Sequence, residues 1–296
     1  MKSDPAFYLK MIPARLLIAL LFLAPATVVA QPVAAQTAPA QNKPAQAAPA
    51  QVDPAAALKK LDEMVRMRDG VKLATTVYLP DGQGPWPVVL VRTPYDKSLE
   101  SFRSKPVVWV RRGFAYVIQD VRGKFKSEGQ YRPFVDDPQD GYDTVEWAAS
   151  QQWSTGKVGM YGPSAMGITA NLAAMTAPPH LVATFVMIAR SSIYNQSAFM
   201  GGVFRKELNE TWLKNNNALD ALYETFKHNV YDGYYDSNEM SLHWGKIRVP
   251  SYNWGGWYDI FSEGNIQNFV GLQSVGGGRA RGNQKLMMGP WGHGRI

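Results

Sequence analysis

The alternation of short apolar runs with helix-like segments across residues 86–189 constrains the fold more than any other feature of this sequence. The predicted strands are 86–95, 114–120, 157–162 and 181–189, and the predicted helices are 98–112, 136–151 and 165–177. Each strand-like run contains a continuous apolar stretch, whereas a strand with one face in water alternates apolar and polar residues. Such runs are typical of a mostly parallel sheet with helices on both faces, so the sequence predicts an α/β fold.

The flanking regions complete this outline. Residues 63–80 contain two alternating runs around Asp69-Gly70, which is the pattern of a β-hairpin. Strand-like runs resume at 247–256 and 283–290. Residues 190–246 are aromatic and polar, with helix-like periodicity and no clear strand, so we expect them to form an insertion.

The first 57 residues have the composition of a targeting segment followed by a linker. A basic region ends at Arg15, and residues 16–30 form an apolar stretch that is interrupted by Pro25 and ends in a small-residue cleavage site. We expect residues 1–30 to be a signal peptide, the alternative being an uncleaved anchor. Residues 31–57 are rich in Ala, Pro and Gln and predict a linker. Both alternatives predict a secreted or periplasmic protein, and cleavage would leave no stable membrane span.

Composition narrows the classes of function. The chain has 296 residues, 46% of them hydrophobic, enough for a sizeable core. Its net charge of +7 comes from scattered Lys and Arg residues, which argues against nucleic-acid binding. The absence of cysteine excludes disulfides, thiolate metal sites and a cysteine nucleophile. Four histidines and no nucleotide motif predict that neither a metal nor a cofactor is needed.

A serine in the segment VGMYGPSAMGIT (158–169) is the first candidate for chemistry. Ser164 lies where a predicted strand turns into a predicted helix, which would expose its hydroxyl near a helix N-terminus. The usual G-x-S-x-G pattern would place glycine at 166, but Met166 is there and the second glycine is Gly167. The motif is weak by itself, because glycine-flanked serines are common in such turns.

A serine nucleophile needs a base and an orienting acid, and in this fold the expected chain order is serine, acid, histidine. His293 follows an apolar strand on a glycine-rich loop, whereas His180 precedes a strand and the other two histidines lie in the insertion. Asp259 follows the preceding strand. We therefore take His293 as the candidate base and Asp259 as the candidate acid, the alternatives being a surface histidine and a helix cap.

Five blocks together resemble one family: RTPYDK (92–97), DVRGKFKSEGQY (120–131), GKVGMYGPSAMG (156–167), GGWYDIF (255–261) and MGPWGH (288–293). In order and spacing, from about residue 62 to the end, the chain is similar to the cocaine-esterase/X-Pro dipeptidyl-peptidase family, which includes α-amino-acid ester hydrolases. The resemblance implies an α/β-hydrolase core at 58–189 and 247–296, with a helical cap at 190–246. Members of the family carry this serine turn with the second glycine at the position of Gly167.

The resemblance also implies roles. Ser164 would be the nucleophile, Asp259 the acid and His293 the base, and the Tyr95 hydroxyl with the Ala165 N–H would form the oxyanion hole. The implied function is a serine acyl hydrolase acting on a small ester or a short peptide through an acyl-enzyme. The residues do not discriminate esterase from peptidase, and the oligomeric state is left open.

Two departures from the family pattern qualify this prediction. The family commonly has tyrosine after the nucleophile, where this chain has Ala165, so a wall of the substrate pocket differs. Relatives also continue well past the position of His293 with the rest of the core and a jelly-roll domain. We therefore expect a truncated form that lacks the jelly roll, and the alternative function is an inactive or binding-only remnant.

Other residues allow two interpretations each. Asp120 and Arg122 predict a local ion pair or support for a turn. Three tryptophans near the candidate acid and base could line an acyl pocket or pack in the core: Trp254, Trp257 and Trp291. The acidic, aromatic segment 231–239 could bind a substrate ammonium group or form a solvated loop.

Overall fold

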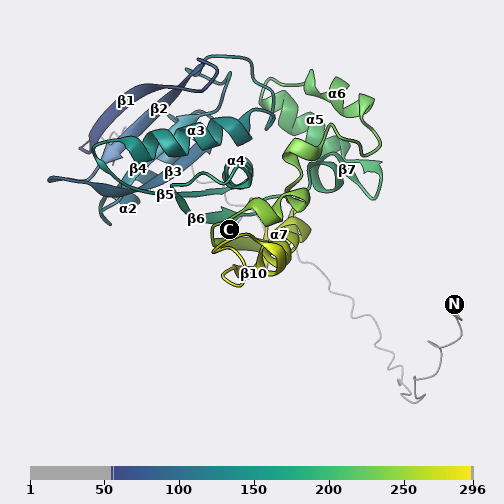
Figure 1. Ribbon diagram of the computed structural model, residues 1–296. Coiled ribbons are helices and arrows are strands. Elements are labelled where there is room, and N and C mark those ends of the chain that lie inside the picture. The colour runs from purple at the N-terminus through teal and green to yellow at the C-terminus, as the bar shows by residue number, and fades with distance from the viewer. Residues whose placement is uncertain (1–54, 56, 295–296) are drawn as a thin grey trace, which may run out of the picture. The chain divides into compact units, whose positions relative to one another are not determined.

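An eight-stranded sheet organises the fold, with the strand order β1-β2-β4-β3-β5-β6-β9-β10 (Figure 1). The computed structural model describes residue 55 and residues 57–294, so the predicted signal peptide and most of the predicted linker lie outside the described residues. The strands are β1 (Lys59–Arg66), β2 (Lys72–Leu79), β3 (Trp86–Thr93), β4 (Ala115–Asp120), β5 (Ser154–Pro163), β6 (Leu181–Met187), β9 (Ser251–Tyr258) and β10 (Lys285–Gly292).

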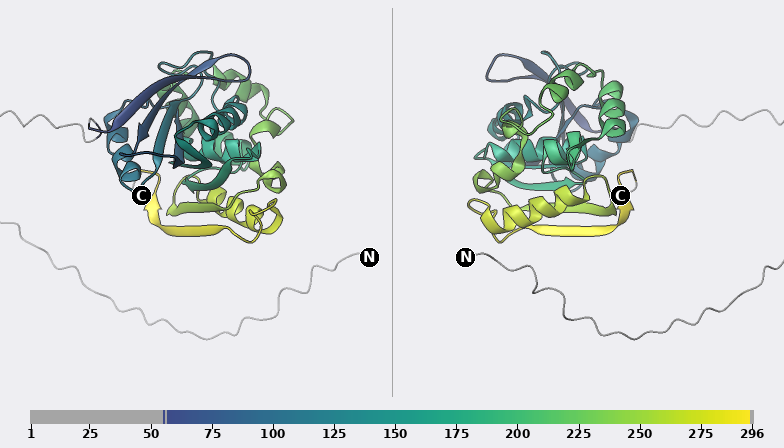
Figure 2. Two further views of the ribbon diagram at one scale, coloured as in Figure 1. Left: turned by 60° about the vertical axis from the view of Figure 1, so that its left-hand side comes forward. Right: turned by 90° about the vertical axis from the view of Figure 1, so that its right-hand side faces the viewer.

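The sheet is mostly parallel, as predicted. Strands β1 and β2 form the predicted antiparallel hairpin, and β2 pairs antiparallel with β4. From β4 to β10 every neighbouring pair is parallel. Parallel strands in one layer place their carboxyl ends along one edge, so the loops after β5, β9 and β10 meet there. Figure 2 shows β10, in yellow, at the border of the sheet.

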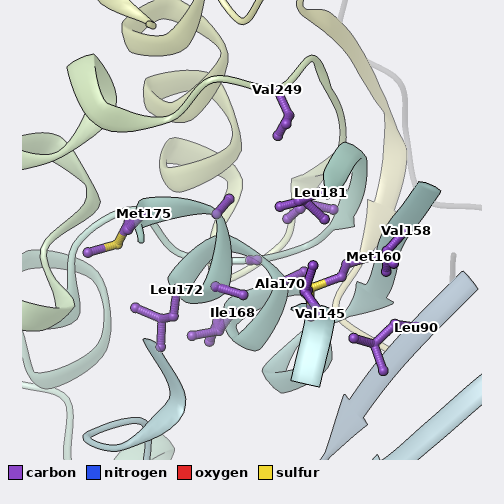
Figure 3. Close-up of a cluster of buried hydrophobic side chains, with 14 of the residues drawn as sticks. Leu90, Val145, Val158, Met160, Ile168, Ala170, Leu172, Met175, Leu181 and Val249 are labelled. Atoms are coloured by element: carbon purple, nitrogen blue, oxygen red, sulfur yellow. The ribbon is translucent and has the colours of Figure 1, made fainter. Parts of the chain in front are cut away.

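The continuous apolar runs are explained by burial on both faces. Along β3, Val88 and Leu90 belong to one buried cluster, while Val89 and Val91 belong to another. Alternate side chains of a strand point to opposite faces, so both faces of β3 are covered. The larger cluster packs α3 (Asp137–Ser150) and α4 (Ala165–Met175) against the sheet (Figure 3). The smaller cluster contains Val110 of α2 (Lys105–Val110) on the other face.

Helix α4 is buried along its whole length. Its small residues let it approach the sheet closely, and larger ones such as Leu172 pack in the larger buried cluster. Full burial of a leucine side chain stabilises a fold by roughly 1.5–3 kcal/mol. The helix that begins at the candidate nucleophile is therefore anchored in the core.

Three elements differ from the sequence prediction. The helix predicted at 98–112 is two short helices, α1 (Glu100–Arg103) and α2, because Pro106 starts a new helix near its first turn. Helix α7 (Ser262–Val275) was not predicted. The insertion contains a small hairpin, β7 (Phe199–Met200) and β8 (Val203–Phe204), where no strand was expected.

The other regular elements of residues 190–246 are short helices and turns joined by irregular segments, and the insertion is helical in this sense. It comprises a π-helix (Tyr194–Ala198), α5 (Lys206–Asn215), α6 (Ala221–Lys227) and three 3-10 turns (Asp236–Asn238, Met240–Leu242 and Trp244–Lys246). Helices α5 and α6 and strand β7 gather at one side of the core (Figure 1). Within the described part of the chain, no helix is long and apolar enough to cross a membrane.

Candidate active site

Ser164 occupies the sharp turn between β5 and α4, with φ 55° and ψ −126°. A positive φ is strained for a residue with a side chain and is typical of a nucleophile held on a strand-to-helix turn. Its N–H donates to the carbonyl of Met187 at 3.0 Å, and its carbonyl accepts from the N–H of Ile168 at 2.9 Å. These backbone bonds hold the strained conformation in place.

The geometry of this turn explains the unusual glycine spacing. A Cβ added at Gly162 would lie 2.4 Å from the Cβ of Met166, and one added at Gly167 would lie 2.7 Å from the carbonyl oxygen of Gly162. Both positions therefore need glycine, because strand and helix approach each other there. Residue 166 tolerates a side chain, and Met166 packs in the smaller buried cluster.

The structure brings the three candidate catalytic side chains into one line. Ser164 Oγ lies 2.8 Å from Nε2 of His293, and His293 Nδ1 lies 2.7 Å from Oδ2 of Asp259. Asp259 directly follows β9 and His293 directly follows β10, so two parallel neighbours present them at the same edge. An Nδ1–H that donates to the carboxylate leaves Nε2 free to accept the serine proton.

The side chains of Asp259 and His293 differ in solvent exposure. The Asp259 side chain is completely buried, and that of His293 is 31% exposed. The second carboxylate oxygen of Asp259 accepts from the N–H of Phe261 at 2.7 Å, so the carboxylate is fixed from two sides. The ring of Phe261 packs edge-on against the imidazole at 5.4 Å. The imidazole is thus oriented on one side and accessible on the other.

Two candidate donors for a developing oxyanion line the same cavity as Ser164. Ala165 is the first residue of α4, and a helix cannot satisfy the N–H of its first residue internally. The Tyr95 hydroxyl accepts a hydrogen bond from Nε1 of Trp212 at 2.9 Å. Burial raises the pKa of Tyr95, an effect opposed by hydrogen bonds with Trp212 and Ser164, so the phenol keeps its proton at neutral pH.

Trp212 is a site residue that sequence reasoning missed. It lies on α5 of the cap, and its ring stacks on that of Phe134 with centroids 5.4 Å apart and planes 18° from parallel. No local motif marks it, because its place beside Tyr95 depends on how the cap folds over the core.

The cavity has a volume of about 280 Å³ and lies between core and cap. Its wall also contains Arg190 and several cap side chains: Ile193, Ser197, Leu208, Leu213 and Tyr235. The three tryptophans do not line it. Trp254 and Trp291 pack against each other at 5.7 Å, and Trp257 is 60% exposed. The acyl-pocket interpretation of these tryptophans is therefore wrong, and the first two are half-buried residues that pack on each other outside the buried clusters.

Asp120 and Arg122, for which either a local ion pair or turn support was expected, do not pair with each other. Arg122 instead bridges Asp140 and Asp69, at 2.6 and 2.7 Å. Asp120 accepts from the N–H of Lys97 at 2.8 Å. Both residues nevertheless support the loop after β4, so the turn-support interpretation agrees with the structure.

The acidic segment 231–239 contributes rings but no carboxylate to the cavity. Tyr234 and Tyr235 line the wall, whereas Asp232 pairs with His228 at 2.7 Å. Glu239 is buried and accepts from the Ser192 hydroxyl at 2.6 Å. The segment is thus neither an ammonium site of this cavity nor simply a solvated loop. No group of His, Asp and Glu suited to a metal ion occurs among the described residues.

A mostly parallel sheet in this order, with a serine on the turn after β5 and a cap inserted after β6, defines an α/β hydrolase. Within that class, the chain belongs to the X-Pro dipeptidyl-peptidase (S15) family, whose model matches residues 69–225 and 213–295. The resemblance predicted from the five blocks is therefore confirmed.

Individual relatives agree with this assignment. The cocaine esterase of Rhodococcus sp. (strain MB1 Bresler) is 30% identical over 284 residues, covering 79% of this chain and 48% of that protein. An α-amino acid ester hydrolase structure has a TM-score of 0.67 at 26% identity, covering 85% of this chain and 50% of that one. A CocE/NonD family hydrolase from Staphylococcus aureus has a TM-score of 0.70 at 24% identity, covering 78% and 46%, and supports the fold alone. The chain thus spans about half the length of these relatives.

Proposed function

We propose that this protein is a serine hydrolase that cleaves small ester or amide substrates through an acyl-enzyme. The observation that carries the proposal is the unbroken line from Asp259 through His293 to Ser164, with separations of 2.7 and 2.8 Å, at the wall of a cavity. Nucleophile, base and orienting acid in hydrogen-bond reach are what activates a serine hydroxyl.

In the first half-reaction Ser164 Oγ attacks the substrate carbonyl while Nε2 of His293 takes its proton. Asp259 keeps the imidazole in the required tautomer and stabilises its charged form. The negative charge that develops on the carbonyl oxygen is stabilised by the Tyr95 hydroxyl and the Ala165 N–H. His293 then gives its proton to the leaving alcohol or amine, and the acyl group remains on Ser164.

In the second half-reaction His293 removes a proton from water, and the resulting hydroxide attacks the acyl-enzyme. The same two donors stabilise the second tetrahedral intermediate. His293 then returns a proton to Ser164 Oγ as the carboxylic acid leaves. The partial exposure of His293 supports this role, because water and the leaving group must both pass the imidazole.

A fluorophosphonate probe, which phosphonylates activated serines, tests the proposal. Labelling of the purified protein that disappears in Ser164→Ala and persists in Ser150→Ala, an exposed serine on α3, is the expected result. Absence of labelling in a sample that is folded by circular dichroism would favour the alternative of an inactive or binding-only protein.

Activity measurements distinguish whether the protein prefers ester or peptide substrates. The relatives include a cocaine esterase and an α-amino acid ester hydrolase, and the family is described as X-Pro dipeptidyl-peptidases. Rates with p-nitrophenyl acetate, an X-Pro anilide and an α-amino ester discriminate these possibilities.

We also propose export from the cytoplasm, supported by the basic and apolar character of residues 1–30. Fractionation of cells that express the full chain, with N-terminal sequencing of the product, tests it. A cytoplasmic product that retains residue 1 would contradict it.

A further inference from the structure

A buried cation lies in the wall of the cavity that holds Ser164. Arg190 is 3% exposed and follows β6, on the strand-end edge that also carries the serine. Its Nη2 has no hydrogen-bond partner, and none of the ion pairs in the described part of the chain involves it. A buried guanidinium normally has a carboxylate or several acceptors around it.

The carboxylates that act on Arg190 have other hydrogen-bond or ion-pair partners. Glu239 and Asp137 act on Arg190 electrostatically, but neither forms an ion pair with it. Asp137 pairs with Arg92 at 2.7 Å, and Glu239 accepts from the hydroxyls of Ser192 and Ser241 at 2.6 and 2.8 Å. Burial lowers the pKa of Arg190 to about 10, so the group is still a cation at neutral pH.

The guanidinium is held in a defined position without an ion pair. Its central carbon lies 5.0 Å from the centroid of the Phe134 ring, and Phe134 in turn stacks on Trp212. An arginine that stacks on an aromatic face keeps its N–H groups directed outward in the plane of the fork. That arrangement suits the two oxygens of a carboxylate.

The charge of the cavity wall has one sign. No Asp or Glu belongs to the residues that line it in the described chain, whereas Arg190 does. A substrate ammonium group would find no carboxylate there and would meet a cation. A substrate with an anionic group would find an unpaired donor in a largely apolar surround.

The exposed imidazole indicates which part of the substrate faces Arg190. The leaving group takes its proton from His293, which is partly exposed, and departs on that side. The acyl group stays on Ser164 and occupies the enclosed part of the cavity, where Arg190, Leu213 and Tyr235 are buried. We propose that Arg190 binds a carboxylate at the far end of the acyl group, so that the preferred substrates are half-esters or half-amides of dicarboxylic acids. This inference rests on the proposed serine hydrolase function.

A matched pair of esters tests the inference. Mono-p-nitrophenyl adipate has a free carboxylate. Methyl p-nitrophenyl adipate is a diester with the same acyl chain, but its second carboxyl group is esterified and carries no charge. After subtraction of spontaneous hydrolysis, kcat/KM should favour the acid by about 10- to 100-fold, the range expected for hydrogen bonds to a charged group. Arg190→Met should abolish this preference, so that kcat/KM for the acid falls to that for the neutral diester. Equal rates for the two esters in the wild-type protein would overturn the proposal.

A binding measurement separates this inference from the proposed function. Calorimetric titration of Ser164→Ala with adipate requires no turnover, and adipate should bind while the dimethyl ester binds at least tenfold more weakly. Turnover of neither ester together with Arg190-dependent adipate binding would refute the hydrolase function and retain the anion site. No adipate binding, or equal binding to Ser164→Ala with and without Arg190→Met, would refute the site.

The stability of Arg190→Met distinguishes substrate binding from a structural role. Replacement of an unpaired buried cation by an apolar side chain should leave the midpoint of thermal unfolding unchanged or raise it. A large fall in this midpoint would show that Arg190 neutralises Glu239 and Asp137 and would overturn the proposal. If the variant does not fold, Arg190→Gln serves the same comparison.

Discussion

Replacement of Trp212 by phenylalanine tests whether the cap positions a group of the active site. The indole N–H donates to the Tyr95 hydroxyl at 2.9 Å and so occupies an acceptor position of that oxygen. The phenolic proton must then point in another direction, where a developing oxyanion can accept it. A phenylalanine keeps a ring stacked on Phe134 but removes this donor.

The size of the effect follows from the bond that is lost. One neutral hydrogen bond contributes about 0.5–1.5 kcal/mol net, which corresponds to a roughly 2- to 12-fold decrease in kcat. Loss of the oxyanion donor itself, in Tyr95→Phe, should decrease kcat about 100- to 1000-fold. KM should change little in both variants, because the interaction strengthens only as charge develops.

Steady-state kinetics on p-nitrophenyl acetate for the two single variants and the double variant decide the matter. If Trp212 acts through Tyr95, Trp212→Phe should cost nothing further once the Tyr95 hydroxyl is gone. A further 2- to 12-fold loss in the double variant would refute this reasoning and indicate an independent effect of the indole on the cavity.

Three further predictions concern stability and are measured by chemical denaturation. Gly167→Ala should destabilise the protein by about 1–3 kcal/mol, because the added Cβ would lie 2.7 Å from the carbonyl oxygen of Gly162. Arg92→Met should destabilise it by about 3–5 kcal/mol, because it leaves the buried carboxylate of Asp137 without its partner at 2.7 Å. Burial raises the pKa of Asp120 to about 6, so the native state holds this proton more tightly than the unfolded state does. As the pH rises from about 4 to 6, the wild-type protein should therefore lose on the order of 2–3 kcal/mol relative to Asp120→Asn.

The first two of these predictions each have a matched control. Gly233→Ala should be nearly neutral, since the nearest atom to the added Cβ is 3.7 Å away. Lys227→Met breaks an exposed pair with Glu224 and should cost at most about 1 kcal/mol. Parallel pH profiles for the wild-type protein and Asp120→Asn would contradict the third prediction. Equal effects of a test variant and its control would contradict the first or the second.

The core and the candidate triad could be predicted because they depend on patterns that are local in the sequence. Continuous apolar runs indicate strands buried on both faces, and such strands in parallel bring their carboxyl ends together. Ser164, Asp259 and His293 each directly follow a strand of the parallel part of the sheet. Their proximity could therefore be predicted from the positions of the strands, without knowing how the cap folds.

Helix α7 and the β7–β8 hairpin were missed because their sequence patterns are weak. Helix α7 buries Asn265 and Asn268, which interrupt its apolar stripe, and their amides bond to the carbonyls of Phe261 and Arg190. The β7–β8 hairpin has strands of two residues, too short for a visible alternation. Only the Gly201-Gly202 turn, with φ of 58° and 82°, marked it.

The roles of Arg190 and Trp212 could not be predicted for a different reason. Arg190 is one cation among scattered Lys and Arg residues, and only the fold shows that it is buried without a partner. Trp212 lies on an amphipathic cap helix, where an indole usually packs against the core. Most of the core lies between Tyr95 and Trp212 in the sequence, so no short-range pattern relates them.

The side chains of Arg190, Phe134, Trp212 and Tyr95 form a continuous run of contacts from one wall of the cavity to the hydroxyl beside Ser164. Selectivity and rate are consequently not separate properties that protein engineering can adjust one at a time. Libraries that vary only one of these residues will miss useful replacements, because the neighbouring side chains still have shapes that fit the original residue. Joint randomisation of the four positions is the search strategy that this architecture demands.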